Sequence, residues 1–172
     1  MTPSIEVRLQ SIIHGLRDVI LPAIDPNEAL AAEQSGLVLA QLSMLLKQMP
    51  FADRYNRLCR DDARATAEAV IAGAAGGPRS RGAAEALAVL VADAGAQAPH
   101  AGYLALAQGI GALTRAMYAD GDAEWRARAD AAILAFVCRQ NQRERVWFKD
   151  TGFDPYPADL PELASMCADA RA

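Results

Sequence analysis

The sequence predicts an all-α protein, a helical bundle of about six main helices with an extended C-terminal tail and a short terminal helix. Alanine, the best helix former, makes up roughly a fifth of the 172 residues. Apolar residues recur at the three- and four-residue spacing of amphipathic helices, and no segment shows a convincing strand pattern. The chain is long enough for one domain with a real core.

The first predicted helix covers about residues 4–21, and a turn bracketed by Pro22 and Pro26 follows it. Asp25 before Pro26 is typical of an N-cap followed by proline at the first helical position, so the second helix should begin there and stop at about Met49. One apolar stripe of the first helix contains Ile5, Leu9, Ile12, Ile13, Leu16, Val19 and Ile20. The second helix is apolar over more than half its circumference, which is typical of a central helix covered on two sides.

Three glutamines interrupt this second helix. Gln34, Gln41 and Gln48 recur every seven residues, so they follow one line of the helix among its leucines. A buried amide must find hydrogen-bond partners. The row therefore indicates either an interhelical polar network that sets the register or a pocket that binds a ligand, and the sequence leaves both open.

Four further long helices complete the predicted bundle. They cover about residues 51–73, 81–94, 99–118 and 122–149. Glycine, proline and the turn Asp120–Gly121–Asp122 separate these helices from one another. Ser80 is a possible N-cap of the fourth helix. The segment Thr151–Pro157 should lie extended over the bundle, and Asp159 with Glu162 fits a capping box for a short last helix.

The third helix has a carboxylate within its apolar face. Asp62 shares that face with Tyr55, Cys59, Thr66 and Val70. An unpaired buried carboxylate disfavours its ionised form, so Asp62 needs a partner, for which Arg17, Gln41 and Tyr103 are candidates. A structural hydrogen bond and a general base both fit this position. We expect Gln41 and Asp62 to lie in one interhelical polar cluster.

Two other segments carry candidate sites. In the sixth helix Gln140 and Glu144 lie beside an apolar side that includes Trp147, and Arg139 and Arg143 flank them. Trp147 and the aromatic residues that follow it in the chain suit either a packed tail or a surface for an apolar ligand or partner. The glycine-rich loop 76–82 resembles an anion-binding helix start, but it lacks the ending of a phosphate-binding loop and suits an ordinary surface loop.

The fifth helix has a ridge of small residues that allows close helix approach, and the sequence does not say whether the partner helix is in the same chain. The ridge consists of Gly102, Ala105, Gly109, Ala112 and Ala116.

Composition disfavours several classes of protein. The net charge of −4 argues against a nucleic-acid binder. No apolar run approaches the length of a membrane span and no signal peptide is evident, so we expect a cytoplasmic protein without membrane partners. Cys59, Cys138 and Cys167 are widely spaced, which predicts small buried hydrophobic residues rather than disulfides.

No metal or other cofactor is expected. The two histidines, His14 and His100, stand in no ligand motif, and three scattered cysteines cannot supply an ordinary zinc site. The sequence also lacks the glycine and serine motifs of nucleotide-binding folds and hydrolases.

The prediction for the whole chain is one all-α domain over residues 1–172, with possible sub-halves at 1–75 and 80–172. The function that fits best is non-enzymatic: self-association as a homodimer or binding of another protein, with room for a small apolar ligand between helices. The alternative is an enzyme with a metal-free polar pocket around Gln34, Gln41, Asp62 and Gln140. Tyr55 and Trp147 complete the set of candidate lining residues.

Overall fold

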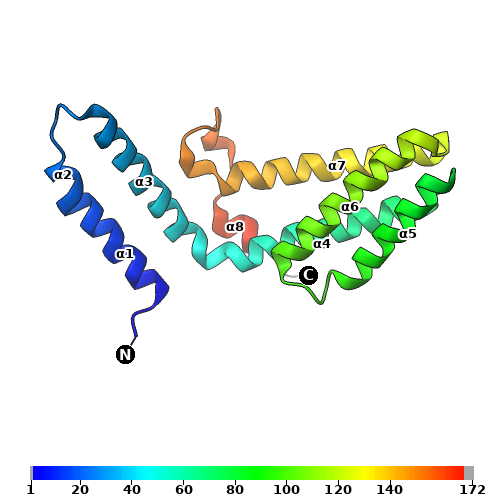
Figure 1. Ribbon diagram of the computed structural model, residues 1–172, viewed down its shortest axis with the longest axis horizontal. Coiled ribbons are helices and arrows are strands. Elements are labelled where there is room, and N and C mark those ends of the chain that lie inside the picture. Colours follow the sequence, from blue (N-terminus) through cyan, green and yellow to red (C-terminus); the bar gives the residue numbers. More distant parts are fainter. Residues whose placement is uncertain (1, 169–172) are drawn as a thin grey trace. The chain divides into compact units, whose positions relative to one another are not determined.

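The computed structural model describes residues 2–168, and its regular elements in that range are helices (Figure 1). The long ones are α1 (Ile5–Gly15), α3 (Ala29–Gln48), α4 (Ala52–Ile71), α5 (Pro78–Asp93), α6 (Pro99–Asp120) and α7 (Ala123–Trp147). Two short ones are α2 (Leu21–Ala23) and α8 (Leu163–Ala168). The predicted all-α class, with six main helices and a short terminal helix, is confirmed.

The chain divides into two compact units. The first contains the residues up to Ala52 together with Arg145–Leu163, and the second contains Asp53–Glu144 and the chain from Ala164 onward. The divisions therefore fall inside continuous helical stretches. The loop near residue 77, where the sequence suggested a possible boundary, lies within the second unit.

The first unit begins with a helical hairpin. Ser4 caps α1 by accepting a hydrogen bond from the backbone N–H of Val7 at 3.3 Å. A π-helical turn, Leu16–Ile20, leads into α2, and α3 returns alongside α1 (Figure 1). Asp25 does not cap α3 as expected. Its carboxylate accepts from the backbone N–H of Asn27 at 2.9 Å, which makes it part of the turn, and α3 begins at Ala29.

The apolar surface of this hairpin is mostly uncovered. Ile13 is buried in α1 and Gln48 in α3, whereas the larger apolar side chains of α3 lie partly or fully in solvent. Leu30 is 69% exposed and Leu37 is 52% exposed. Within the first unit α3 is not covered on two sides as expected, because α1 contacts only part of its wide apolar arc.

The second unit holds the main hydrophobic core. Residues from α4, α5, α6 and α7 meet there, and Leu106, Leu113 and Trp125 are almost completely buried. The indole N–H of Trp125 donates to the backbone oxygen of Val70 at 2.9 Å, so α7 is joined to the end of α4 by a buried hydrogen bond.

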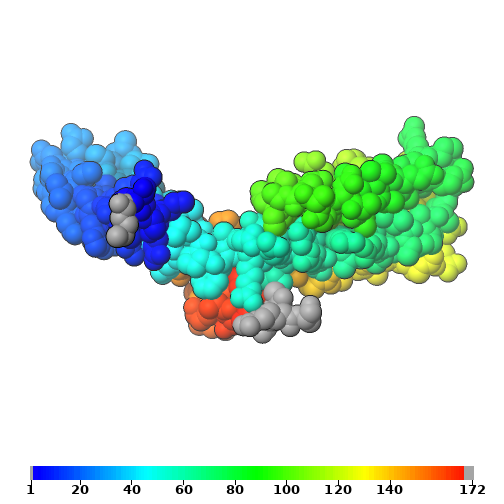
Figure 2. Space-filling model, turned by 90° about the horizontal axis from the view of Figure 1, so that it is seen from below, coloured from blue at the N-terminus to red at the C-terminus, as the bar shows by residue number. Residues whose placement is uncertain are grey.

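Small residues of α6 allow α5 to pack closely against it. The atoms of these two green segments form one continuous mass in the space-filling view (Figure 2). A Cβ added at Gly109 would lie 2.8 Å from the Cδ1 atoms of both Leu87 and Leu90. The partner of this ridge at Gly109 is therefore a helix of the same chain. An apolar groove of about 300 Å³ remains between the two helices, and its lining is Ala83, Ala86, Leu87, Leu90, Ala105, Gln108, Gly109 and Ala112.

The segment between α7 and α8 is less extended than expected, because 3-10 turns form at Lys149–Thr151 and Pro157–Asp159. The Asp154 carboxylate binds the Arg145 guanidinium at 2.8 Å and orders this segment. Glu162 pairs with Lys149 at 2.9 Å instead of making the contact expected of a capping box.

Candidate functional site

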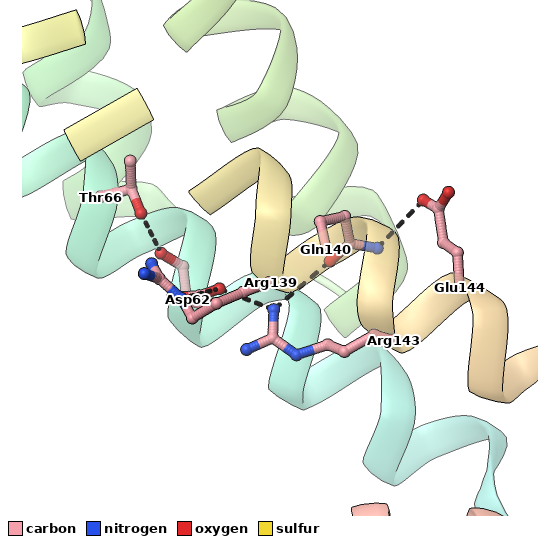
Figure 3. A network of polar contacts seen from close by, with 6 residues as sticks. All are labelled: Asp62, Thr66, Arg139, Gln140, Arg143 and Glu144. Atoms are coloured by element: carbon pink, nitrogen blue, oxygen red, sulfur yellow. Dashed lines mark hydrogen bonds and ion pairs between the residues drawn. The ribbon is translucent and has the colours of Figure 1, made fainter. Parts of the chain in front are cut away.

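The main polar cluster of the second unit is centred on Asp62. Its side chain is 14% exposed, on the face of α4 that also buries Cys59, Ala63 and Thr66. Two arginines of α7 bind its carboxylate (Figure 3). Arg139 donates from Nη2 at 2.7 Å and from Nε at 3.1 Å, and Arg143 donates from Nη1 at 2.6 Å. The carboxylate thus has a charged partner on each oxygen.

These partners differ from the expected ones. Arg139 and Arg143 bind the carboxylate, for which Arg17, Gln41 and Tyr103 were the candidates. The expected common cluster of Gln41 and Asp62 stays a prediction, because Gln41 belongs to the first unit and Asp62 to the second. Gln41 is exposed on α3. The four-residue spacing of Arg139 and Arg143 places both guanidinium groups on one face of α7, but it does not indicate that this face meets α4.

The charge state of Asp62 follows from this geometry. Burial by itself would raise its pKa, but the hydrogen bonds from Arg139 and Arg143 outweigh that effect and the pKa lies below its usual value. The side chain is therefore ionised at neutral pH and its oxygens are already engaged. Such a carboxylate joins α4 to α7 well and is poorly suited to accept a proton as a general base.

Gln140 and Tyr55 extend the same cluster. Gln140 is 8% exposed; its amide N–H donates to Glu144 at 3.2 Å, and its oxygen accepts from Arg143 at 3.5 Å (Figure 3). Burial raises the pKa of the Tyr55 hydroxyl and the pKa of the Cys59 thiol. Both groups keep their protons at neutral pH, which disfavours a thiolate nucleophile here.

The glutamine row splits into two environments. Gln48 is 6% exposed, and its amide donates to the backbone oxygen of Trp147 at 2.8 Å. Gln34 and Gln41 are exposed. A cavity of about 40 Å³ beside Gln48 has room for water but is far below the size of a typical substrate site. Its lining includes Lys47, Gln48, Trp147 and Lys149.

The glycine-rich loop before α5 does bind an anion, but the anion is part of the chain. The Asp120 carboxylate accepts from the backbone N–H groups of Arg79 at 2.8 Å and Ser80 at 2.9 Å, and from the Ser80 hydroxyl at 2.6 Å. A Cβ at Gly77 would lie 2.3 Å from this carboxylate. Asp120 therefore caps α5 in the role that the sequence suggested for Ser80. The sequence indicated only a turn at Asp120.

The cysteines and the metal-ligand residues show no further site. Cys59 and Cys167 are buried as expected, while Cys138 is exposed. Within residues 2–168, His, Cys, Asp and Glu side chains form no group of three that could hold a metal ion. The expectation of a metal-free protein stays a prediction.

One helical stretch, Ala29–Ile71, is long and apolar enough to cross a membrane by length and composition. Only 6% of its most apolar part is buried. No apolar run of this length was expected from the sequence; glutamine and serine interrupt α3, but their side chains are uncharged. A buried core helix of a soluble protein passes the same test, whereas this segment is mostly exposed.

Comparisons with protein-family models, with curated proteins and with solved structures found no match to this chain.

Proposed function

We propose that this protein acts by self-association, through the apolar surface of the α1–α3 hairpin, rather than by catalysis. The observation that carries the proposal is the exposure of large apolar side chains along both helices of the hairpin. They are Ile5, Val7, Ile12, Val19 and Ile20 before the turn and Leu30, Leu37, Val38 and Leu45 after it, each about half exposed or more. Large apolar side chains exposed along two neighbouring helices are typical of a protein interface.

A second copy of the chain suits this surface better than an anionic membrane. Up to Gln48 the chain has five carboxylate side chains, while the basic residues are Arg8, Arg17 and Lys47. Surfaces that bind anionic lipids usually carry clustered lysine and arginine. Two hairpins that pair their apolar faces would form a four-helix bundle, in which each copy supplies the cover that α3 lacks.

The enzyme alternative has less support. Asp62 and Gln140 share Arg143 in a cluster whose polar atoms already bind one another, and Gln34 and Gln41 are exposed on α3. A catalytic carboxylate of this kind would need an accessible oxygen and a pKa nearer the working pH.

Light scattering behind size exclusion tests the proposal. We expect a mass twice the 18.3 kDa of one chain. Leu37→Glu should shift the protein to the monomer, because it places a charge within the interface. Val89→Glu is the matched control, since Val89 is 60% exposed on α5, and this variant should remain a dimer.

A wild-type protein that stays monomeric over a wide range of concentration would contradict the proposal. So would a Leu37→Glu variant that dimerises as well as Val89→Glu. If a monomeric wild-type chain floated with neutral lipid vesicles, membrane binding would replace self-association as the proposed function.

A further inference from the structure

The exposed face of α3 has a regular arrangement. Six residues that turn toward solvent lie within an arc of about 100° when successive residues are placed about 100° apart. They are Leu30, Gln34, Leu37, Val38, Gln41 and Leu45. Leucine and valine thus share one face with two glutamines, and this face receives no cover from α1.

This face is symmetrical about its own midpoint, which lies between Leu37 and Val38. Leu30 and Leu45 are equally far from that point on opposite sides. The same holds for Gln34 and Gln41. Such a pattern of leucines and glutamines matches itself when the helix direction is reversed.

We propose that the self-association described above, on which this inference rests, pairs α3 antiparallel with α3 of a second copy about a two-fold axis between Leu37 and Val38. Leu30 then lies level with Leu45 of the partner subunit. Gln34 lies level with Gln41 of the partner subunit. A two-fold axis makes each of these contacts twice.

The glutamines select this register. Each amide offers both a donor and an acceptor, so Gln34 and the partner's Gln41 satisfy one another in a reciprocal pair. A shift of one helical turn would place an amide against leucine, where burial without a hydrogen bond is costly. The glutamine row then acts as a polar register device inside an apolar interface.

Charge disfavours the parallel arrangement. The turn end of the hairpin carries Asp18, Asp25, Glu28 and Glu33 with Arg17 as its basic residue. Parallel pairing would bring two such acidic ends together, and like charges at an interface oppose binding. Antiparallel pairing separates them.

Cysteine cross-linking tests the direction of pairing. The background is Cys138→Ser, because Cys138 is the exposed native cysteine. An equal mixture of the Leu30→Cys and Leu45→Cys variants should give a covalent dimer on mild oxidation. Leu30→Cys alone should not, since the two copies of position 30 would be roughly 22 Å apart along the axis.

Charge substitutions at the glutamines test the register. Gln34→Glu with Gln41→Lys places opposite charges at the same level in the antiparallel dimer and should preserve it. Gln34→Glu with Gln41→Glu places like charges there and should raise the dissociation constant by about tenfold or more. Gln10→Glu, at an exposed glutamine of α1, is the control and should change the dissociation constant little.

The outcomes separate the two proposals. The antiparallel pairing would be contradicted if the Leu30→Cys variant cross-linked by itself. It would also be contradicted if the two Gln34/Gln41 double variants had equal dissociation constants. Either result would leave self-association in place. A chain that is monomeric at all concentrations would contradict both. The pairing would be supported if Leu30→Cys cross-linked to Leu45→Cys and the Gln34→Glu, Gln41→Lys variant remained a dimer.

Discussion

The α1–α3 hairpin and the α4–α7 core differ in burial although both are helical. The hairpin helix α3 is rich in leucine, yet its buried residue is Gln48. The more polar α4 buries Cys59, Ala63, Thr66, Ala67 and Val70. In α4 the apolar residues form one narrow face that other helices cover, whereas in α3 they spread around the helix. Burial thus depends on how apolar residues are arranged and what covers them, more than on how many there are.

Truncation of a leucine should separate the two regions most clearly. Leu106→Ala opens a cavity beside a fully buried side chain and should lower the free energy of unfolding by about 2–5 kcal/mol. Leu37→Ala, at a 52% exposed position, should cost less than about 1 kcal/mol in the monomer. Urea unfolding at low protein concentration measures both. Equal losses would mean that α3 is covered within the single chain.

Removal of the Asp62 carboxylate should have the next largest effect. Asp62→Ala leaves Arg143, whose side chain is 17% exposed, without its carboxylate, and should cost about 1–3 kcal/mol. Asp53→Ala is the control: it breaks an exposed ion pair with Arg57 and should change the free energy of unfolding little.

The pH dependence of this difference follows from the lowered pKa of Asp62. A carboxylate whose pKa is lower in the folded state adds stability above its unfolded pKa and loses it as the pH falls through the folded pKa. The stability gap between the wild type and Asp62→Ala should therefore shrink in acid, below about pH 4. A gap that widened in acid would contradict the charged contact.

Glycine-to-alanine changes should act with opposite signs in the two regions. At Gly109 the new Cβ would press on Leu87 and Leu90 at 2.8 Å, and we expect a net loss of about 1 kcal/mol. At Gly36 on α3 no heavy atom lies within 4 Å of the added Cβ, so the higher helix propensity of alanine should stabilise the chain by about 0.5–1 kcal/mol. Chemical denaturation of the two variants compares them directly.

The last comparison concerns the cap of α5, with an expected effect close to that of the glycine changes. Hydrogen bonds from Ser80 and from the backbone of Arg79 lower the pKa of Asp120, which keeps the carboxylate ionised at the helix start. Asp120→Ala should lower the melting temperature by about 2–4 °C at neutral pH and by less in acid. Asp93→Ala, at the other end of α5, should not lower it.

Several features were predictable from local sequence. Proline begins α6 at Pro99, as its place before a helical segment predicts. Pro50 lies two residues beyond the end of α3 at Gln48, close to the expected stop. By contrast, α5 begins at Pro78 rather than at about residue 81. The need for a partner at Asp62 also followed from its place on an apolar face. Its arginine partners did not, because the sequence separation of 77 residues between Asp62 and Arg139 carries no information about which helix faces α4.

By itself, the sequence determined the helices, their approximate ends and the positions where a polar group interrupts an apolar face, since these depend on propensity and periodicity within one segment. The tertiary structure decided the rest. It placed Asp120 at the start of α5, 40 residues away in the chain, and it buried Gln48 while leaving Gln34 and Gln41 in solvent. Contacts between segments depend on which faces pack together, and a periodic pattern along one helix does not specify its partner.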